Sequence, residues 1–118
     1  MPIPPRVHPK NVTSPKRRLK YPHAIHAGND WSLAVGVWDG NRVMLIRWND
    51  DPSKPLGNPV SHGHPTWFVL PPAFHEAAFE HARTTDAARA ERARDWLDEG
   101  GADEWPYGPD EFLEAHNE

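Results

Sequence analysis

The sequence predicts an α+β fold, in which an antiparallel sheet of three or four strands precedes one long helix or two consecutive helices. Three observations support this prediction. The longest apolar run, WSLAVGVWDGNRVMLIRW at residues 31–48, has an Asp-Gly pair at its centre, as a hairpin does. A shorter apolar run, TWFVL at residues 66–70, has the composition of a further strand. Residues 72–99 have the alanine and charge content of a helix.

The hairpin is predicted to bend at Asp39 and Gly40, because this pair readily adopts the positive φ angles of a type I′ turn. A two-residue turn gathers the large side chains of both strands on one face, which we expect to lie beneath the helix. A three-residue loop with Gly40 or Asn41 in the left-handed conformation is the alternative, and it would shift the register. With the two-residue turn, the face expected beneath the helix comprises Trp31, Leu33, Val35, Val37, Met44, Ile46 and Trp48, and the opposite face Ser32, Ala34, Gly36, Trp38, Val43, Leu45 and Arg47.

The strand at residues 66–70 has apolar side chains on both faces, which predicts a strand that is central or covered on both sides. Pro72 suits the first turn of the helix that follows, and Gly100-Gly101 suits its end. Thr84-Thr85-Asp86 interrupts the helical pattern with residues that are better at caps than in helix interiors. One kinked helix and two helices, about 72–83 and 86–99, therefore remain alternatives.

The first 24 residues are rich in proline, which is disfavoured in helices and in paired strands. We therefore expect an extended arm, with the alternative that Val12, Leu19, Tyr21 and Ile25 hold this segment against the sheet. The predicted organisation is a basic arm at residues 1–24, a single domain at 25–99 and an acidic aromatic tail at 100–118, both tails being extended.

Charge is strongly segregated along the chain, although the net charge is only -4. This asymmetry predicts either a basic arm for an anionic partner or a basic arm held by its own acidic tail. Two solvated tails without partners are the alternative. The cations of residues 1–23, where no acid occurs, are Arg6, Lys10, Lys16, Arg17, Arg18 and Lys20; the acids after Arg94, where no cation occurs, are Asp95, Asp98, Glu99, Asp103, Glu104, Asp110, Glu111, Glu114 and Glu118.

The composition argues against several functional classes. The absence of cysteine excludes disulfides, thiolate catalysis and thiolate zinc sites. No apolar run approaches the ~18 residues of a membrane span, and the first residues do not resemble a secretory signal. We therefore expect a cytoplasmic protein without a membrane partner.

Catalytic and metal-binding motifs are weak. The serines lack the setting of an activated nucleophile, and we expect the carboxylates of Glu76 and Glu80 to be solvated on a helix surface. His62 and His64 are two residues apart and would point the same way on an extended segment, as metal ligands can. No established metal-binding spacing accompanies them, so we expect surface histidines, no cofactor and no enzyme activity. A metal-dependent enzyme that uses these loop histidines is an alternative.

The basic run PKRRLK, at residues 15–20, is of the type that binds phosphate backbones. Proteins hold single-stranded nucleic acid on surfaces that combine such cations with aromatic rings, on which bases stack. Trp38 could supply a ring, or it could instead pack beneath the arm or at a dimer interface. The candidate nucleic-acid-binding residues from these patterns are Lys16, Arg17, Arg18, Lys20, Trp38, Arg42 and Arg47.

The order of elements also resembles a known family. A strand, a tight turn, a strand that ends Ile46-Arg47-Trp48, a polar loop with Lys54-Pro55, the strand TWFVL, and then proline and a long helix resemble the positive cofactor four family of single-stranded-DNA-binding transcriptional coactivators. The resemblance covers about residues 33–98. It implies a curved sheet that grips unpaired DNA and a homodimer formed through the helices.

Carried over by position, the resemblance implies that Arg47 and Trp48 lie on the binding strand and adds Lys54, in the flanking loop, to the candidates. Pro65-Thr66-Trp67 stands where that family has a Lys-Gly pair. From the basic arm, the aromatic hairpin and this resemblance, we expect a small non-enzymatic protein that binds single-stranded nucleic acid and regulates transcription. The alternative from another class is a protein-interaction module or inhibitor that presents the acidic aromatic tail to a partner protein.

Overall fold

The β2–β3 hairpin organises the structure. In the computed structural model, which describes residues 8–99, β2 (Trp31–Trp38) and β3 (Asn41–Trp48) pair without a register shift, with Trp31 opposite Trp48 and Val37 opposite Arg42. Asp39 and Gly40 have φ angles of 50° and 86°, as the type I′ turn requires. The predicted two-residue turn and its register are confirmed.

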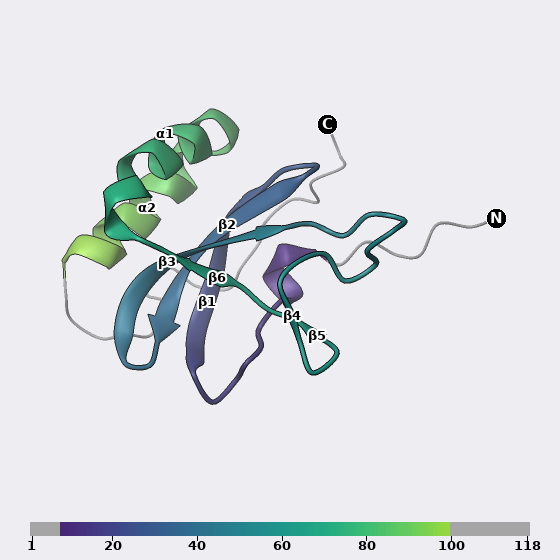
Figure 1. The fold of residues 1–118 in the computed structure, drawn as a ribbon. Helices are drawn as coiled ribbons and strands as arrows, with labels where there is room; N and C mark the ends of the chain where they lie inside the picture. The colour runs from purple at the N-terminus through teal and green to yellow at the C-terminus, as the bar shows by residue number, and fades with distance from the viewer. Residues whose placement is uncertain (1–7, 100–118) are drawn as a thin grey trace.

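Two further strands complete a four-stranded antiparallel sheet in the order β1-β2-β3-β6, and two helices cover one of its faces (Figure 1). This arrangement confirms the predicted α+β fold. The predictions for residues 1–7 and 100–118, including the acidic aromatic tail, lie outside the described residues. The remaining elements are η1 (Pro9–Asn11), β1 (Leu19–Ala27), β4 (Val60–Ser61), β5 (His64–Pro65), β6 (Phe68–Leu70), η2 (Pro72–Phe74), α1 (His75–Thr85) and α2 (Ala87–Asp98).

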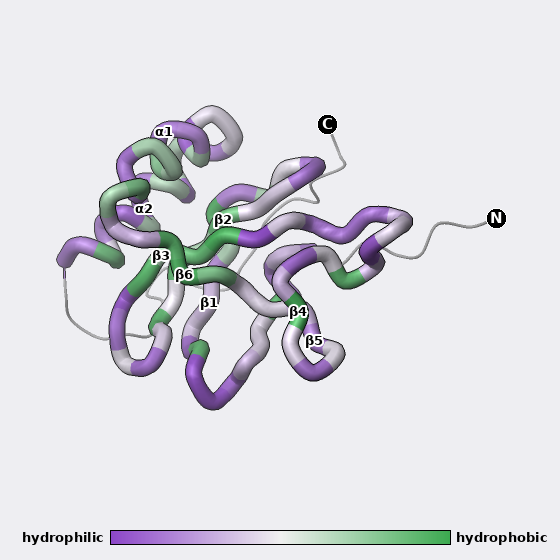
Figure 2. Tube along the Cα trace, in the orientation of Figure 1, coloured by the Kyte–Doolittle hydropathy of each residue, from purple (hydrophilic) through white to green (hydrophobic). Residues whose placement is uncertain are grey.

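The sheet has a hydrophobic core on each face, and strongly hydrophobic residues gather along β2, β3 and β6 (Figure 2). The alternation of β2 sends successive side chains to the two faces, as period two requires. The helix-side core contains Ile25, Leu33, Val35, Val37, Met44, Ala78, Phe79, Ala82, Ala90, Ala93 and Trp96; the far-side core contains Val12, Leu19, Ala34, Leu45 and Trp67.

The prediction that the first 24 residues form an unpaired arm is wrong for Leu19–Ala24, which pair with β2 in β1. Pro22 is tolerated because β1 is an edge strand of the described sheet and a register shift between Lys20 and His23 leaves this proline outside the ladder. The alternative that the segment is held against the sheet is confirmed for Val12, Leu19 and Ile25, which are buried.

The prediction of a covered or central strand at residues 66–70 is also wrong. β6 has three residues, pairs with β3 alone and leaves Phe68 and Val69 exposed. The apolar pattern on both faces has two causes. Trp67 precedes the strand and enters the far-side core, where its indole donates to the Val12 carbonyl at 2.8 Å, whereas Phe68 lies on the helix side but beyond the cover of the helices.

Residues 72–99 contain two helices after the short turn η2, so the two-helix alternative is the correct one. Asp86 separates them because its carboxylate accepts a hydrogen bond from the Arg89 backbone N–H at 3.0 Å and caps α2. Of the residues expected beneath the helices, Trp48 is an exception, with 58% of its surface exposed. None of the helices in residues 8–99 is long and apolar enough to cross a membrane.

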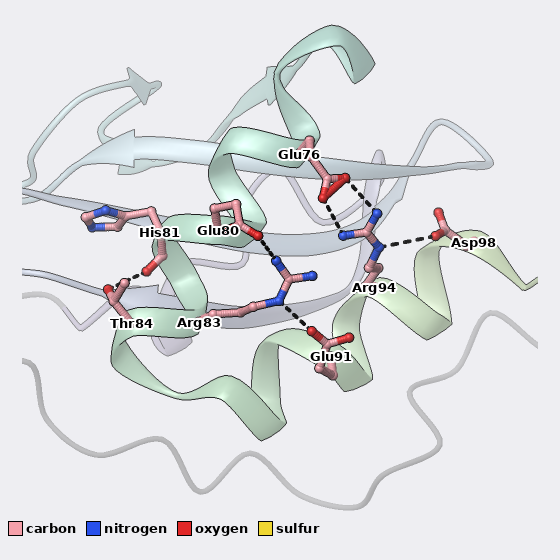
Figure 3. A network of polar contacts seen from close by, with 8 residues as sticks. All are labelled: Glu76, Glu80, His81, Arg83, Thr84, Glu91, Arg94 and Asp98. Carbon is pink, nitrogen blue, oxygen red and sulfur yellow. Dashed lines mark hydrogen bonds and ion pairs between the residues drawn. The ribbon is translucent and has the colours of Figure 1, made fainter.

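Ion pairs join the outer surfaces of α1 and α2 (Figure 3). Arg94 donates to both carboxylate oxygens of Glu76, at 2.7 and 2.6 Å, and Arg83 contacts Glu80 and Glu91. The hydrogen bonds from Arg94 lower the pKa of the exposed Glu76 carboxyl. Glu76 therefore joins α1 to α2 through Arg94, whereas Glu80 pairs with Arg83 within α1, and both carboxylates lie on an exposed surface.

Candidate nucleic-acid interface

The predicted nucleic-acid-binding residues do not form one continuous surface. Four of them lie together in the turn that leads into β1, where the Pro15 carbonyl accepts hydrogen bonds from the backbone N–H groups of Arg18, at 3.0 Å, and Leu19, at 2.8 Å. Leu19 is buried in the far-side core and fixes the turn to the sheet. The four cations of this turn, all exposed, are Lys16, Arg17, Arg18 and Lys20.

This turn lies beside the tip of the β2–β3 hairpin. The backbone N–H of Asp39 donates to the Arg18 carbonyl at 2.9 Å, and the two side chains form an ion pair at 3.9 Å, each with 54% of its surface exposed. A pair so exposed and so long is largely screened by water. Lys16, Arg17 and Lys20 have no ion-pair partner among residues 8–99. The turn therefore presents a net positive surface.

Tyr21, for which the sequence indicated only a packing role, is a further feature of this surface. It follows Lys20 directly, lies in the β1 bulge and has 45% of its surface exposed. Its φ angle is 52°, a conformation that costs a bulky residue about 1–3 kcal/mol. The fold thus keeps a strained aromatic residue next to the cations. The available sequence signal was the tripeptide Lys-Tyr-Pro immediately after the basic run.

Trp38 and Arg42, near the hairpin tip, have structural contacts instead. Trp38 is half-buried and packs against the far-side core, which contains Val12 and Leu19. This position agrees with the alternative that Trp38 packs beneath the N-terminal segment. The Arg42 guanidinium lies 4.6 Å from the Trp96 ring centroid and donates to the Trp96 carbonyl. Arg42 therefore connects β3 to α2, and these contacts occupy its charged group.

Arg47 was predicted to lie on the binding face, but it is only 3% exposed. Its guanidinium donates to the carbonyls of Thr66, at 2.7 Å, and Leu56, and to that of Trp48, at 3.3 Å. Burial lowers its pKa to about 10, so it remains a cation at neutral pH. Because the loop at residues 49–67 folds its carbonyls over this side chain, Arg47 holds the loop rather than a ligand.

Lys54 lies in that same loop, at the other end of β3 from the hairpin tip. The Asp51 carboxylate accepts hydrogen bonds from the Ser53 N–H, the Ser53 hydroxyl and the Lys54 N–H, at 2.8, 2.7 and 2.9 Å. These hydrogen bonds fix the turn that carries Lys54. Because this turn follows the end of β3, the length of the hairpin separates Lys54 from the four cations of the β1 turn.

The two histidines considered as metal ligands lie on the β4–β5 turn. His62 and His64 are exposed, and His62 has a φ angle of 51°. Within residues 8–99, no three histidine, aspartate or glutamate side chains come close enough together to hold a metal ion.

His26 forms a different cluster at the C-terminal end of α1. Its ring centroid lies 4.9 Å from that of Trp31 and 4.6 Å from that of His81, and its Nδ1 lies 3.0 Å from the Thr85 hydroxyl. Burial, together with the charge of His81, lowers the pKa of His26 to about 4. His26 is therefore neutral at physiological pH and belongs to the packing between β1 and α1.

Comparisons with known proteins assign no relative to the chain. No protein-family model matches it, and neither the curated proteins nor the solved structures contain a significant match.

Proposed function

We propose that this protein binds single-stranded nucleic acid through the surface formed by Lys16, Arg17, Arg18, Lys20 and Tyr21, which we call the basic turn. The observation that carries the proposal is the position of an exposed aromatic ring next to four exposed cations. The protein acts by binding and not by catalysis. Regulation of transcription and formation of a homodimer remain predictions; sedimentation of the full-length chain tests the second.

The cations supply the electrostatic part of the affinity. Each phosphate that a lysine or arginine neutralises releases condensed counterions, so affinity falls as salt rises. Three of the four side chains have no partner among residues 8–99, and the pair between Arg18 and Asp39 is long and exposed. Binding of phosphates therefore breaks no strong interaction within the described fold.

Tyr21 supplies the preference for single strands. An unpaired base can stack on an exposed tyrosine ring, and such stacking is worth about 1–3 kcal/mol per base. The bases of a duplex are already stacked on one another and cannot reach the ring. One ring and four cations within six residues fit a short site of about four nucleotides.

The direct test is a fluorescence anisotropy titration of the full-length protein with labelled oligothymidylate of twelve nucleotides, at several salt concentrations. Four phosphate contacts at roughly 0.7 each give a slope of log affinity against log salt of about −3. A duplex of the same length should bind more weakly. Affinity that does not change with salt, or a preference for the duplex, would contradict the proposal.

A further inference from the structure

A second exposed surface lies at the other end of the sheet, away from the basic turn. A groove with a volume of about 290 Å³ runs over the helix-side face at the end of β3, and its lining is almost wholly apolar. We call it the aromatic groove. The lining side chains are Trp31, Ile46, Trp48 and Phe68, with Arg47 beside them.

Strand register brings these aromatic residues together. Trp31 lies opposite Trp48, and Ile46 lies opposite Phe68, so all four share one face of three neighbouring strands. The helices cover this face nearer the hairpin tip, where Arg42 lies over Trp96. The groove end is left open, with Trp48 58% and Phe68 49% exposed. Large exposed aromatic groups that are grouped in this way mark interaction sites more often than chance surface positions.

An acidic cleft adjoins the groove and shares Trp48 with it. The cleft has a volume of about 480 Å³ and contains three carboxylates, those of Asp30, Asp50 and Asp51, against the single ammonium group of Lys54. Hydrogen bonds from Ser53 and Lys54 lower the pKa of the Asp51 carboxyl, which is therefore ionised at neutral pH. The Arg47 guanidinium beside the groove is also attracted to Asp50. With three carboxylates against the two cations of Lys54 and Arg47, this end of the sheet combines apolar surface with one more negative than positive charge.

The walls of the cleft are fixed by buried polar contacts. The Asn49 side chain accepts a hydrogen bond from the Ser32 hydroxyl and donates to the Gly28 carbonyl, both at 2.7 Å. Its backbone N–H donates to the Asp30 carbonyl at 2.8 Å. Gly57, with φ of 69°, lies so close to β3 that an added Cβ would come within 2.5 Å of the Trp48 carbonyl. The surface is therefore formed before a ligand arrives, which reduces the entropy lost on binding.

We propose that the aromatic groove and the acidic cleft form one docking surface for a partner protein, which inserts an aromatic or branched apolar side chain flanked by lysine or arginine. The groove has room for one large side chain, and the neighbouring carboxylates attract a flanking cation that can also lie over the Trp48 ring. The same carboxylates repel phosphates, so nucleic acid is excluded here. The two ends of the sheet bind ligands of opposite charge.

The test uses the full-length protein labelled with ¹⁵N and a blocked peptide of sequence lysine-tryptophan-lysine-arginine as the probe. Addition of the peptide should shift the indole signals of Trp31 and Trp48. A peptide with glutamate in place of its basic residues should not bind, and one with alanine in place of tryptophan should bind about tenfold more weakly.

Two variants separate the apolar from the charged contribution. Trp48→Ala should weaken peptide binding about tenfold, while Phe74→Ala, which removes an equally exposed ring outside the groove, should leave it unchanged. Asp50→Asn retains the shape of the cleft and should weaken binding about twofold to fivefold at low salt. If either variant fails to fold, the other retains the test.

Four results would overturn the inference. The peptide could shift signals outside the groove and cleft, or the glutamate peptide could bind as well as the basic one. The Trp48 indole could move on addition of oligothymidylate, which would make the groove part of the nucleic-acid site. It could also move with protein concentration alone, which would identify a second copy of the chain as the occupant.

Discussion

The β2–β3 hairpin connects the two ends of the sheet (Figure 1). The two ends nevertheless differ in charge. Near the hairpin tip, the basic turn places four cations next to Tyr21 in the chain. At the other end of the hairpin, Asp30, Asp50 and Asp51 line the same cleft as Trp48. β2 has eight residues, so the two ends lie roughly 25 Å apart along the strands. This distance exceeds the Debye length of about 8 Å at physiological salt. Each end can therefore hold a ligand without a strong electrostatic effect from the other.

The distribution of charge along the sequence does not predict its distribution over the folded surface. The segregation visible in the sequence is between the N-terminal cations and the acids after Arg94. Within the described residues, the acidic end of the sheet comes instead from three aspartates in the middle of the chain, and turns on either side of β2 and β3 bring them together.

The largest expected effect is on the framework of the acidic end. Arg47→Met should lower the free energy of unfolding by about 3 kcal/mol or more, because it leaves buried carbonyls of the loop without donors. Urea unfolding followed by tryptophan fluorescence measures this change. Arg17→Met, at the exposed basic turn, is the matched control and should alter the stability by less than about 0.5 kcal/mol. Equal effects of the two substitutions would mean that Arg47 does not hold the loop.

Protonation of His26 at low pH should weaken the packing between β1 and α1, near the end of the sheet that carries the acidic cleft. Its pKa of about 4 in the folded protein lies below the value of 6.5 for the unfolded chain, so the unfolded state binds more protons between these values. Stability should fall as the pH drops from 6.5 towards 4, by about 2–3 kcal/mol in total. Urea unfolding at pH 7 and at pH 4.5 measures the loss.

The pH dependence needs a histidine control. His26→Gln should remove most of the loss between these pH values, whereas His62→Gln, at an exposed position of the β4–β5 turn, should retain it. A loss of the same size in both variants would assign the acid sensitivity to other groups.

Substitutions of Tyr21 should change the affinity for oligothymidylate at the basic end without lowering the stability of the fold. Tyr21→Gly should weaken binding of oligothymidylate by about 1–3 kcal/mol, because the stacking platform is lost. The same substitution should not reduce the stability, because glycine adopts a φ of 52° without strain. Tyr21→Phe retains the ring and should retain the affinity. A glycine variant that is less stable but binds normally would show that the ring serves packing alone.

The smallest effect should come from neutralising one aspartate at each end of the sheet. Asp39→Asn removes the carboxylate beside Arg18, and asparagine tolerates the left-handed turn position, so affinity for oligothymidylate should rise about twofold. Asp51→Asn removes an equivalent charge from the acidic cleft and should leave this affinity unchanged. Anisotropy titrations at low salt measure both, and an equal gain from the two would show that the ends are not independent.

The parts of the fold that depend on local pattern could be predicted from the sequence. The Asp39-Gly40 turn fixes the parity of the hairpin, and parity alone decides which side chains of β2 and β3 share a face. The cap at Asp86 is likewise a local signal. Both follow from residues that are adjacent or a few positions apart in the chain.

The candidate site could be predicted only in part, because burial of a charged side chain depends on distant segments. Lys16, Arg17, Arg18 and Lys20 are exposed as expected, but Arg47 is buried by carbonyls from residues 56 and 66. The exposure of Tyr21 depends on a bulge that the sequence pattern did not indicate. The aromatic groove depends on where the helices stop covering the sheet, which helix length alone does not determine.

The most direct test of the separation between the two ends is one titration of ¹⁵N-labelled full-length protein with oligothymidylate of eight nucleotides. We predict backbone shifts at Lys16, Arg17, Arg18, Lys20 and Tyr21, with the indole signals of Trp31 and Trp48 unchanged throughout. Shifts centred on Trp48 and Phe68, with the basic turn unaffected, would contradict the assignment of nucleic acid to one end of the sheet and of a basic protein segment to the other.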